Sequence, residues 1–387
     1  MKWVNSLQEL FKDAVPNTSR IKYFKENPLL SISITMRCSL RCPYCVSNMF
    51  KPESQRDNFI DKMGTQAFLD KLYSLFKHKF PMQTSIPGTG EPTESPHFAP
   101  LLSKLLEWGN NVTIQTNLNG SKKFEDVLSA YSKAEIHNRV KLVTSYHVGT
   151  MLDRSSEDCY NLRSRYLFEH FPRVVQLGCN VVQVVTPMTP KAIRDGQIVE
   201  DYHYLYSLHK FQPVITELYH FYQGKTYPRD YTPEDRQLLQ SVRAKIFEAC
   251  LYKPQTFHDV PNQEQVKYNT AAFELKRMPC YKPTYHLDIL ATGQLRICQA
   301  QPDWILGQFE TIKPEFVETV FGDEPVPCPA DKCLCRSAGI SGCLSVHGIT
   351  TNEYYHAYYM ERGQPEIAKL FKKTEKIPRI QEEVDSL

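Results

Sequence analysis

The chain repeatedly pairs a short strand-like segment with a longer helical one. The segment 29–35 alternates apolar and Ser/Thr residues with a period of two, which is typical of a β-strand, and from there strand-like segments alternate with amphipathic segments that have helical spacing. Strands that alternate with helices predict a parallel sheet with right-handed crossovers. The predicted strands are 29–35, 83–87, 112–116, 140–146, 180–186 and 213–218, and the predicted helices between them are 65–78, 99–108, 124–133, 154–171 and 202–210.

The pattern changes after residue 220. Thr232 followed by Pro233 and two acidic residues predicts a helix that starts there and runs to about residue 251. Further on, 285–290 and 294–297 alternate as two strands around a turn at Gly293, which predicts a hairpin. Short amphipathic helices are expected at 6–14 and 354–373. The predicted organisation is a lead-in (1–28), an α/β domain (29–220), a linker helix and loop (221–278), a small cysteine-rich domain (279–345) and a C-terminal helix and tail (346–387).

Charge, apolar runs and cysteine distribution argue against several classes of protein for this chain. The formal net charge of the 387 residues is +3, and no long block of like charge occurs, so neither an anionic membrane nor a nucleic acid is the expected partner, although a local basic groove would still allow a nucleic acid. No apolar run is long enough for a signal peptide or a membrane span, which predicts a cytoplasmic protein without a membrane partner. Most of the twelve cysteines cluster, which favours metal ligation in a reducing compartment over disulfides.

The first cysteine cluster follows the first predicted strand directly. Cys38, Cys42 and Cys45 have the spacing Cys-x3-Cys-x2-Cys. Three thiolates from one loop can hold three irons of a four-iron cluster, and the fourth iron is then free to bind a cofactor or substrate. The alternative is a zinc site, but zinc requires a fourth Cys or His nearby and none follows before His78.

This spacing, with Tyr44 just before the last cysteine and a strand before the first, resembles the signature of the radical S-adenosylmethionine (SAM) enzymes. The resemblance implies that the three cysteines hold a 4Fe-4S cluster whose open iron binds SAM. One electron then cleaves SAM to a 5′-deoxyadenosyl radical, which abstracts hydrogen from the substrate. It also implies an α/β fold, a partial (β/α)6 barrel followed by a small cysteine-rich auxiliary-cluster domain, and an electron donor such as flavodoxin or ferredoxin.

A second motif follows the second predicted strand, in Pro87-Gly88-Thr89-Gly90-Glu91-Pro92-Thr93. Glycines let a backbone approach a ligand closely, and a carboxylate can accept from an ammonium group. Alone, this loop is a common turn. One strand after the cysteine loop, it resembles the family's Gly-Gly-Glu-Pro motif, which binds the SAM amino group, with Thr89 in place of the first glycine.

Other candidates stand where later strands end, since ligands gather at the carboxyl ends of parallel strands. The family commonly uses a polar residue after the fourth strand for SAM, here Ser145, unless its hydroxyl merely caps the strand. His147 is a candidate proton relay or a structural histidine. Met188 lines the adenine pocket or packs in the core. The residues expected to contact SAM are Tyr44, Gly90, Glu91, Pro92, Asn117, Ser145 and Met188.

The second cysteine set begins with the predicted hairpin, which has Cys280 and Cys298 at its outer ends. It resembles the auxiliary-cluster region called SPASM, or its shorter twitch form, whose opening pattern is Cys-x9-15-Gly-x4-Cys. The downstream spacing departs from the full SPASM pattern, and six thiols cannot fully ligate two four-iron clusters. One auxiliary 4Fe-4S cluster is therefore expected, with structural zinc as the alternative. Its ligands would be Cys280, Cys298 and two of Cys328, Cys333, Cys335 and Cys343, with Cys333 or Cys335 and one outer partner favoured.

These motifs predict a radical SAM oxidoreductase that acts on a peptide side chain or small metabolite, with the auxiliary cluster accepting an electron or binding substrate. Nothing at the N-terminus resembles a domain that recognises a peptide leader, which weakens the peptide branch. The alternative within the class is modification of a nucleoside or nucleic acid. The alternative from another class is a zinc-stabilised binding protein.

Overall fold

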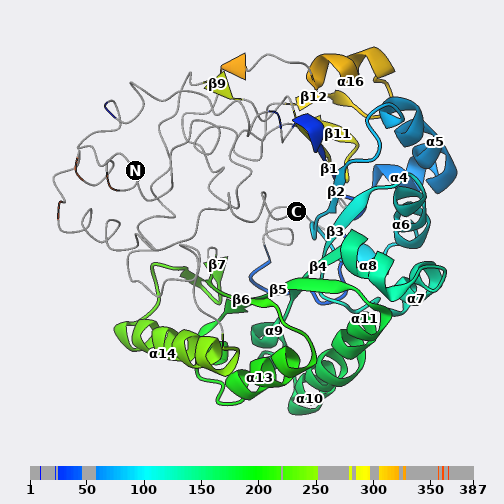
Figure 1. The fold of residues 1–387 in the computed structure, drawn as a ribbon. Coiled ribbons are helices and arrows are strands. Elements are labelled where there is room, and N and C mark those ends of the chain that lie inside the picture. Colours follow the sequence, from blue (N-terminus) through cyan, green and yellow to red (C-terminus); the bar gives the residue numbers. More distant parts are fainter. Residues whose placement is uncertain are drawn as a thin grey trace.

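The computed structural model describes residues 9, 22, 25–45, 58–218, 221–251, 279–280, 285–296, 305–321, 326–327, 356, 360 and 365. Nine of the described strands form one sheet, and the six from β1 to β6 lie in chain order, each parallel to the next (Figure 1). The prediction of an α/β fold around a parallel sheet is therefore confirmed. The six strands are β1 (Leu29–Ile32), β2 (Gln83–Ile86), β3 (Asn111–Thr116), β4 (Val140–Ser145), β5 (Asn180–Met188) and β6 (Gln212–Glu217).

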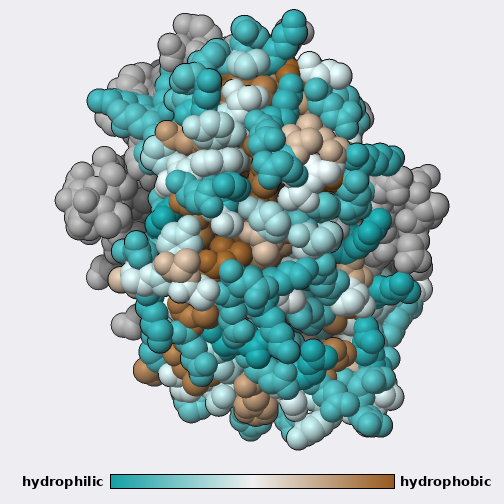
Figure 2. Space-filling model, turned by 90° about the vertical axis from the view of Figure 1, so that its right-hand side faces the viewer, coloured by the Kyte–Doolittle hydropathy of each residue, from teal (hydrophilic) through white to brown (hydrophobic). Residues whose placement is uncertain are grey.

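Helices cover the outer side of this curved sheet (Figure 1). Helix α6 (Phe98–Glu107) shows why, because its buried residues recur at helical spacing and form one apolar stripe. Burying each such side chain contributes about 1.5–3 kcal/mol. The other helices of this layer are α5 (Thr65–Phe76), α7 (Lys122–Leu128), α8 (Lys133–Arg139), α10 (Ser156–Arg165), α11 (Phe171–Leu177), α13 (Ile198–Leu208) and α14 (Pro233–Ala249). Figure 2 shows that polar residues dominate one side of the molecule and that apolar groups form only small separate patches there.

The two faces of the sheet differ in chemistry. Most side chains toward the helices are apolar, and some of the polar ones hydrogen-bond to helical residues, as when the Tyr166 hydroxyl donates to Thr144. Barrel interiors are ordinarily filled by Val, Ile and Leu. On the inner face here, one register row instead crosses six strands with polar side chains. The row consists of Arg296, Asp288, Ser31, Ser85, Thr113 and Lys141.

Several predicted boundaries shift. The strand predicted at 29–35 ends at Ile32. The helix predicted at 124–133 is wrong at its end, because Ser132 caps a separate helix, α8, in a reciprocal capping box with Glu135. The helix predicted at 154–171 starts at Ser156 and continues through a π-helical turn (Tyr166–His170) into α11, which ends at Leu177 before Gly178 in the left-handed region.

The predicted hairpin is present and joins the main sheet. β10 (His286–Ile289) and β11 (Gln294–Arg296) pair antiparallel, and Gly293 in the turn has φ +82°. β12 (Ile305–Gln308) extends the hairpin. The sequence did not predict that β10 pairs parallel with β1, where Leu29 lies opposite His286 and Ile32 opposite Ile289. The predicted hairpin and the first barrel strand therefore belong to one sheet.

The remaining elements are short, apart from the predicted helix α14. That helix begins at Pro233 with a Thr232–Asp235 capping box, as predicted. Residues 356, 360 and 365 are helical, whereas the rest of the predicted helix 354–373, and 6–14 apart from residue 9, lie outside the described residues. No helix among the described parts of the chain is long and apolar enough to cross a membrane. The short elements are α4 (Phe59–Met63), η2 (Pro92–Glu94), α9 (Val148–Leu152), α12 (Pro190–Ile193), β7 (Phe221–Tyr222), β8 (Lys225–Thr226), β9 (Pro279–Cys280), α16 (Pro314–Val320) and β13 (Val326–Pro327).

Candidate active site

The cysteine loop follows β1 and contains a tight turn between Cys42 and Cys45. The Cys45 amide donates to the Cys42 carbonyl at 3.0 Å, and Arg41 takes a positive φ of 48°. Cys42 is buried, whereas Cys38 and Cys45 are partly exposed, and all three are free of disulfides. Burial, with the nearby Glu91 and Glu94 carboxylates, raises the pKa of Cys38 to about 12. A bound metal would offset this cost, since only the thiolate is a ligand.

The Gly90 turn packs directly against the cysteine loop. A Cβ atom at Gly90 would lie 2.4 Å from the Arg37 carbonyl oxygen and 2.6 Å from the Met36 carbonyl carbon. The Glu91 amide donates to the Arg37 carbonyl at 2.8 Å, and the Thr89 hydroxyl donates to the Thr35 carbonyl at 2.9 Å. The two motifs found separately in the sequence therefore form one backbone unit, and glycine is required at position 90 for steric reasons alone.

The Glu91 carboxylate is buried and bound by the protein. Its Oε1 accepts from the Thr93 amide and from the hydroxyls of Thr93 and Thr116, and its Oε2 accepts from the Asn117 amide at 2.6 Å. Burial raises the pKa of Glu91 although these hydrogen bonds act in the opposite direction. The side chain thus ties the turn to the end of β3, while Oε2 can still accept a second donor. Pro92 is also buried, at the start of η2.

The Asn117 side chain hydrogen-bonds to the thiol of Cys38. Its Oδ1 accepts from the Asn119 amide at 2.9 Å, which orients the side-chain amide, and its Nδ2 donates to Cys38 Sγ at 3.5 Å. The structure therefore brings Asn117, Glu91 and Cys38 together. Sequence reasoning placed Asn117 among the SAM contacts and did not find its bond to sulfur.

Tyr44 and His147 form a second polar group beside the loop. The Thr150 hydroxyl donates to the Tyr44 hydroxyl at 3.0 Å, and the Tyr44 hydroxyl lies 3.1 Å from His147 Nδ1. Burial lowers the pKa of His147 to about 4, so the ring is neutral near pH 7. Its backbone carbonyl also accepts from Thr150 and Met151 at the start of α9. These contacts fit the structural alternative for His147.

The other predicted residues differ in their surroundings. Ser145 ends β4 and shares the inner face of the sheet with Val143, with partial exposure. Met188 is fully buried in the core on the helix-facing side of β5, the side from which Thr186 bonds the Tyr202 hydroxyl. Its side chain is therefore not among those that the structure brings to the loop.

Little of the second cysteine set lies within the described residues. In β9, Cys280 stands opposite Val326 of β13, two residues before Cys328. The side chain of Cys280 and all of Cys298, Cys328, Cys333, Cys335 and Cys343 lie outside the described residues. The auxiliary cluster and its ligand set stay predictions.

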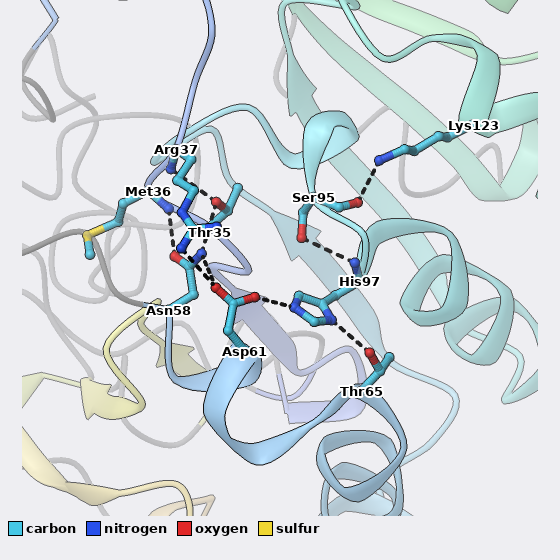
Figure 3. A network of polar contacts seen from close by, with 9 residues as sticks. All are labelled: Thr35, Met36, Arg37, Asn58, Asp61, Thr65, Ser95, His97 and Lys123. Carbon is cyan, nitrogen blue, oxygen red and sulfur yellow. Dashed lines mark hydrogen bonds and ion pairs between the residues drawn. The ribbon is translucent and has the colours of Figure 1, made fainter. Parts of the chain in front are cut away.

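Sequence reasoning missed three polar side chains that contact, directly or through one another, the residues just before Cys38. Asn58, Asp61 and His97 connect α4, α5 and the start of α6 to the backbone in front of Cys38 (Figure 3). The one local signal was Asn58, an N-cap residue type before α4 whose side chain makes no capping bond.

Among the described residues, no three His, Cys, Asp or Glu side chains converge closely enough to hold one metal ion. A cluster binds each cysteine at a different iron, so its ligands lie farther apart than those of one zinc ion. The assignment of Cys38, Cys42 and Cys45 to a 4Fe-4S cluster stays a prediction.

A scan against models of known protein families finds no match. Over 107 residues the chain is 29% identical to the GTP 3′,8-cyclase of Pasteurella multocida, a match that covers 28% of this chain and 30% of the cyclase. The chain therefore matches less than a third of that relative's length.

Similar solved structures include SuiB of Streptococcus suis, with 15% identity and a TM-score of 0.47 over 79% of this chain and 69% of SuiB. They also include anSMEcpe with bound AdoMet, with 13% identity and a TM-score of 0.47 over 90% of this chain and 99% of that chain. The cysteine loop and the Gly90–Glu91 turn, the two motifs that resemble the radical SAM signature, thus form one backbone unit at the carboxyl ends of parallel strands.

Proposed function

We propose that the protein is a radical SAM oxidoreductase that reductively cleaves SAM and removes hydrogen from a hydrophilic small metabolite or peptide side chain. The observation that carries the proposal is the joint unit of the cysteine loop and the Gly90–Glu91 turn, which share the Arg37 carbonyl. A cluster bound by Cys38, Cys42 and Cys45 would supply the electron that converts SAM to the 5′-deoxyadenosyl radical. The turn and Asn117 would orient the ligands around that cluster.

The direct test is anaerobic reconstitution with iron and sulfide, followed by reduction in the presence of SAM. Wild-type protein should release 5′-deoxyadenosine, and Cys42→Ala should release none, because the buried Cys42 is one of three cluster ligands. Cys179→Ala, which changes a buried cysteine in the core, is the matched control. Colourless protein that contains zinc and no iron would end the enzyme proposal in favour of the zinc-stabilised binding protein.

The polar inner face of the sheet supports a hydrophilic substrate. Ser85 and Thr113 are partly exposed, Lys141 is exposed, and all three replace the apolar residues that normally fill a barrel. Hydroxyl and ammonium groups there would hydrogen-bond a substrate's polar groups. In a substrate screen, compounds that accelerate 5′-deoxyadenosine formation should be polar; acceleration by apolar compounds alone would contradict this choice.

The second candidate is a nucleotide substrate. It is favoured by the partial match to a protein whose name gives GTP as its substrate. If it holds, GTP should accelerate SAM cleavage and be consumed in proportion to 5′-deoxyadenosine. GTP that neither binds nor changes the rate would remove this candidate and leave the first intact.

The auxiliary cluster is proposed to be held by Cys280, Cys298 and two of the downstream cysteines. Cys298→Ala should lower reconstituted iron from about eight to about four per chain and block substrate turnover without stopping SAM cleavage. An unchanged iron content would remove Cys298 from the ligand set.

We also propose an acidic electron donor of the flavodoxin or ferredoxin type. Arg37 and Arg41 flank Cys38 and Cys42 in the sequence and are both exposed, so they offer positive charge close to the proposed cluster ligands. Arg41→Glu should slow flavodoxin-driven SAM cleavage and leave the dithionite-driven reaction unchanged. Equal flavodoxin-driven rates for both proteins at low salt would contradict docking at this face.

A further inference from the structure

The backbone of Thr35, Met36 and Arg37, which directly precede Cys38 in the sequence, is hydrogen-bonded on two sides. On one side, two groups of the Gly90 turn donate hydrogen bonds to the carbonyls of Thr35 and Arg37, as described above. On the other side, the Met36 amide donates to Asn58 Oδ1 at 3.0 Å, and the Arg37 amide donates to the Thr35 hydroxyl oxygen at 3.0 Å. The amides of Met36 and Arg37 and the carbonyls of Thr35 and Arg37 therefore have partners within the protein.

On the second side, the Asp61 carboxylate contacts Asn58, Arg37 and His97 (Figure 3). Its Oδ2 accepts from Asn58 Nδ2 at 3.2 Å and lies 3.4 Å from the Arg37 guanidinium. Its Oδ1 lies 2.6 Å from His97 Nε2. Asn58 Nδ2 is also 3.4 Å from the Thr35 hydroxyl. One carboxylate thus orients the Asn58 amide so that its oxygen faces the Met36 amide.

His97 fixes Asp61 from the interior. Its Nδ1 lies 2.7 Å from the Thr65 hydroxyl on α5, and its amide donates to Ser95 Oγ at 3.2 Å. The His97 side chain is only 10% exposed and Asn58 is buried, while the Asp61 side chain is 31% exposed. The Asp61 pair therefore differs from a surface ion pair, which usually contributes little, because its partners are buried and held in place.

We infer that Asn58, Asp61 and His97 are positioning residues. They fix the conformation of the backbone at residues 35–37, just before Cys38 in the sequence, before any cluster or cofactor binds. Asp61 acts through Asn58, and His97 acts through Asp61. If the proposed function holds, the same three residues also fix the first cluster ligand relative to the Gly90 turn, because Arg37 is bonded to both. The inference itself concerns the protein chain alone.

The pattern of donors and acceptors suggests substitutions that keep or remove single hydrogen bonds of Asp61 and His97. Asp61→Asn keeps the shape but removes the charge and leaves one acceptor in place of two: if its oxygen faces His97, its NH2 group meets the donor Asn58 Nδ2, and if its oxygen faces Asn58, His97 must change tautomer and give up the charge-assisted bond from Nε2. His97→Gln can keep a donor near the place of Nε2, whereas His97→Asn is too short to reach Asp61. Asp70→Asn changes an exposed carboxylate of α5 that accepts only from Gln66 and is the matched control.

Hydrogen exchange of the metal-free full-length protein, read on peptides that cover residues 33–38, tests the inference. Loss of one hydrogen bond of average strength, about 1 kcal/mol, corresponds to about fivefold, so exchange in this segment should be at least about fivefold faster in Asp61→Asn and His97→Asn. His97→Gln and Asp70→Asn should match the wild type. Peptides from β3 report any general destabilisation. An unchanged segment in Asp61→Asn, or an increase no larger than that in β3, overturns the inference.

Reconstituted protein gives an independent second readout. At equal iron content, Asp61→Asn and His97→Asn should alter the electron paramagnetic resonance spectrum of the reduced cluster with SAM and slow SAM cleavage at least about tenfold. His97→Gln should restore both. If wild-type protein binds no cluster and cleaves no SAM, the proposed function fails, yet the exchange result still decides whether these residues position the loop.

Discussion

The sharpest prediction concerns two glycines of one turn. In Gly90→Ala the new Cβ would meet the Arg37 carbonyl oxygen at 2.4 Å and the Arg37 amide nitrogen at 2.8 Å, both backbone atoms of the cysteine loop. In Gly88→Ala the nearest atom would be the Gln115 carbonyl oxygen at 3.4 Å, an ordinary contact. The first substitution must push the two loops apart by about 1 Å, which costs about 1–3 kcal/mol, whereas the second needs almost no movement.

The expected consequence is functional as well as structural. A displacement of about 1 Å in a reacting constellation costs about 100-fold in rate, so Gly90→Ala should release 5′-deoxyadenosine about 100-fold more slowly than the wild type. Gly88→Ala should stay within about threefold, since its Cβ meets only ordinary contacts. The assay is anaerobic SAM cleavage with dithionite, normalised to bound iron. Equal rates for the two variants would refute the claim that close approach of the loops is what position 90 requires.

Three further predictions concern individual side chains. Asn117→Ala removes the donor to Cys38 and should lower the cluster's midpoint potential by about 60 mV in a potentiometric titration, since hydrogen bonds to sulfur raise it; an unchanged potential would show that the bond is absent from the loaded site. Burial lowers the pKa of His170 to about 4, so below pH 6.5 the unfolded chain binds a proton that the folded chain does not. The contribution of His170 to stability should therefore fall by about 1.3 kcal/mol between pH 7.5 and 5.5, and His170→Asn should reduce the slope of stability against pH by this amount in urea unfolding, while the other buried histidines keep theirs. Arg163→Met leaves two carboxylates without their buried cation and should cost about 3–5 kcal/mol, whereas the exposed Arg165→Met should cost less than about 1 kcal/mol by the same assay; similar losses would contradict the buried network.

Local patterns were sufficient for most of the parallel sheet. Six strands were predicted because apolar residues on their helix-facing side alternate with polar residues on the inner side, and period-two alternation is read within a few residues. The separate helix α8 was missed although Ser132 and Glu135 mark its start. The pairing of β10 with β1 could not be predicted, because it joins segments far apart in the chain and no local pattern fixes a partner strand.

The candidate site divides in the same way. The cysteine spacing and the glycine–glutamate turn are contiguous motifs, so both were found. The bond from Asn117 to Cys38 and the positioning role of Asp61 depend on contacts between distant segments. His97 looks like any residue before a helix until its two ring nitrogens are seen between Asp61 and Thr65. Such roles depend on tertiary geometry, which residue types alone do not specify.

The pairing of β10 with β1 has a consequence for shortened forms of the protein. The strand that leads into the cysteine loop lies inside the sheet only because β10 bonds along its whole length. A chain cut before β10 would leave β1 as an edge strand with a row of open amide and carbonyl groups, which invites pairing with other chains. Such a fragment would keep all three loop cysteines and yet be prone to aggregate, so the barrel is not a unit that can be separated from the segment after it.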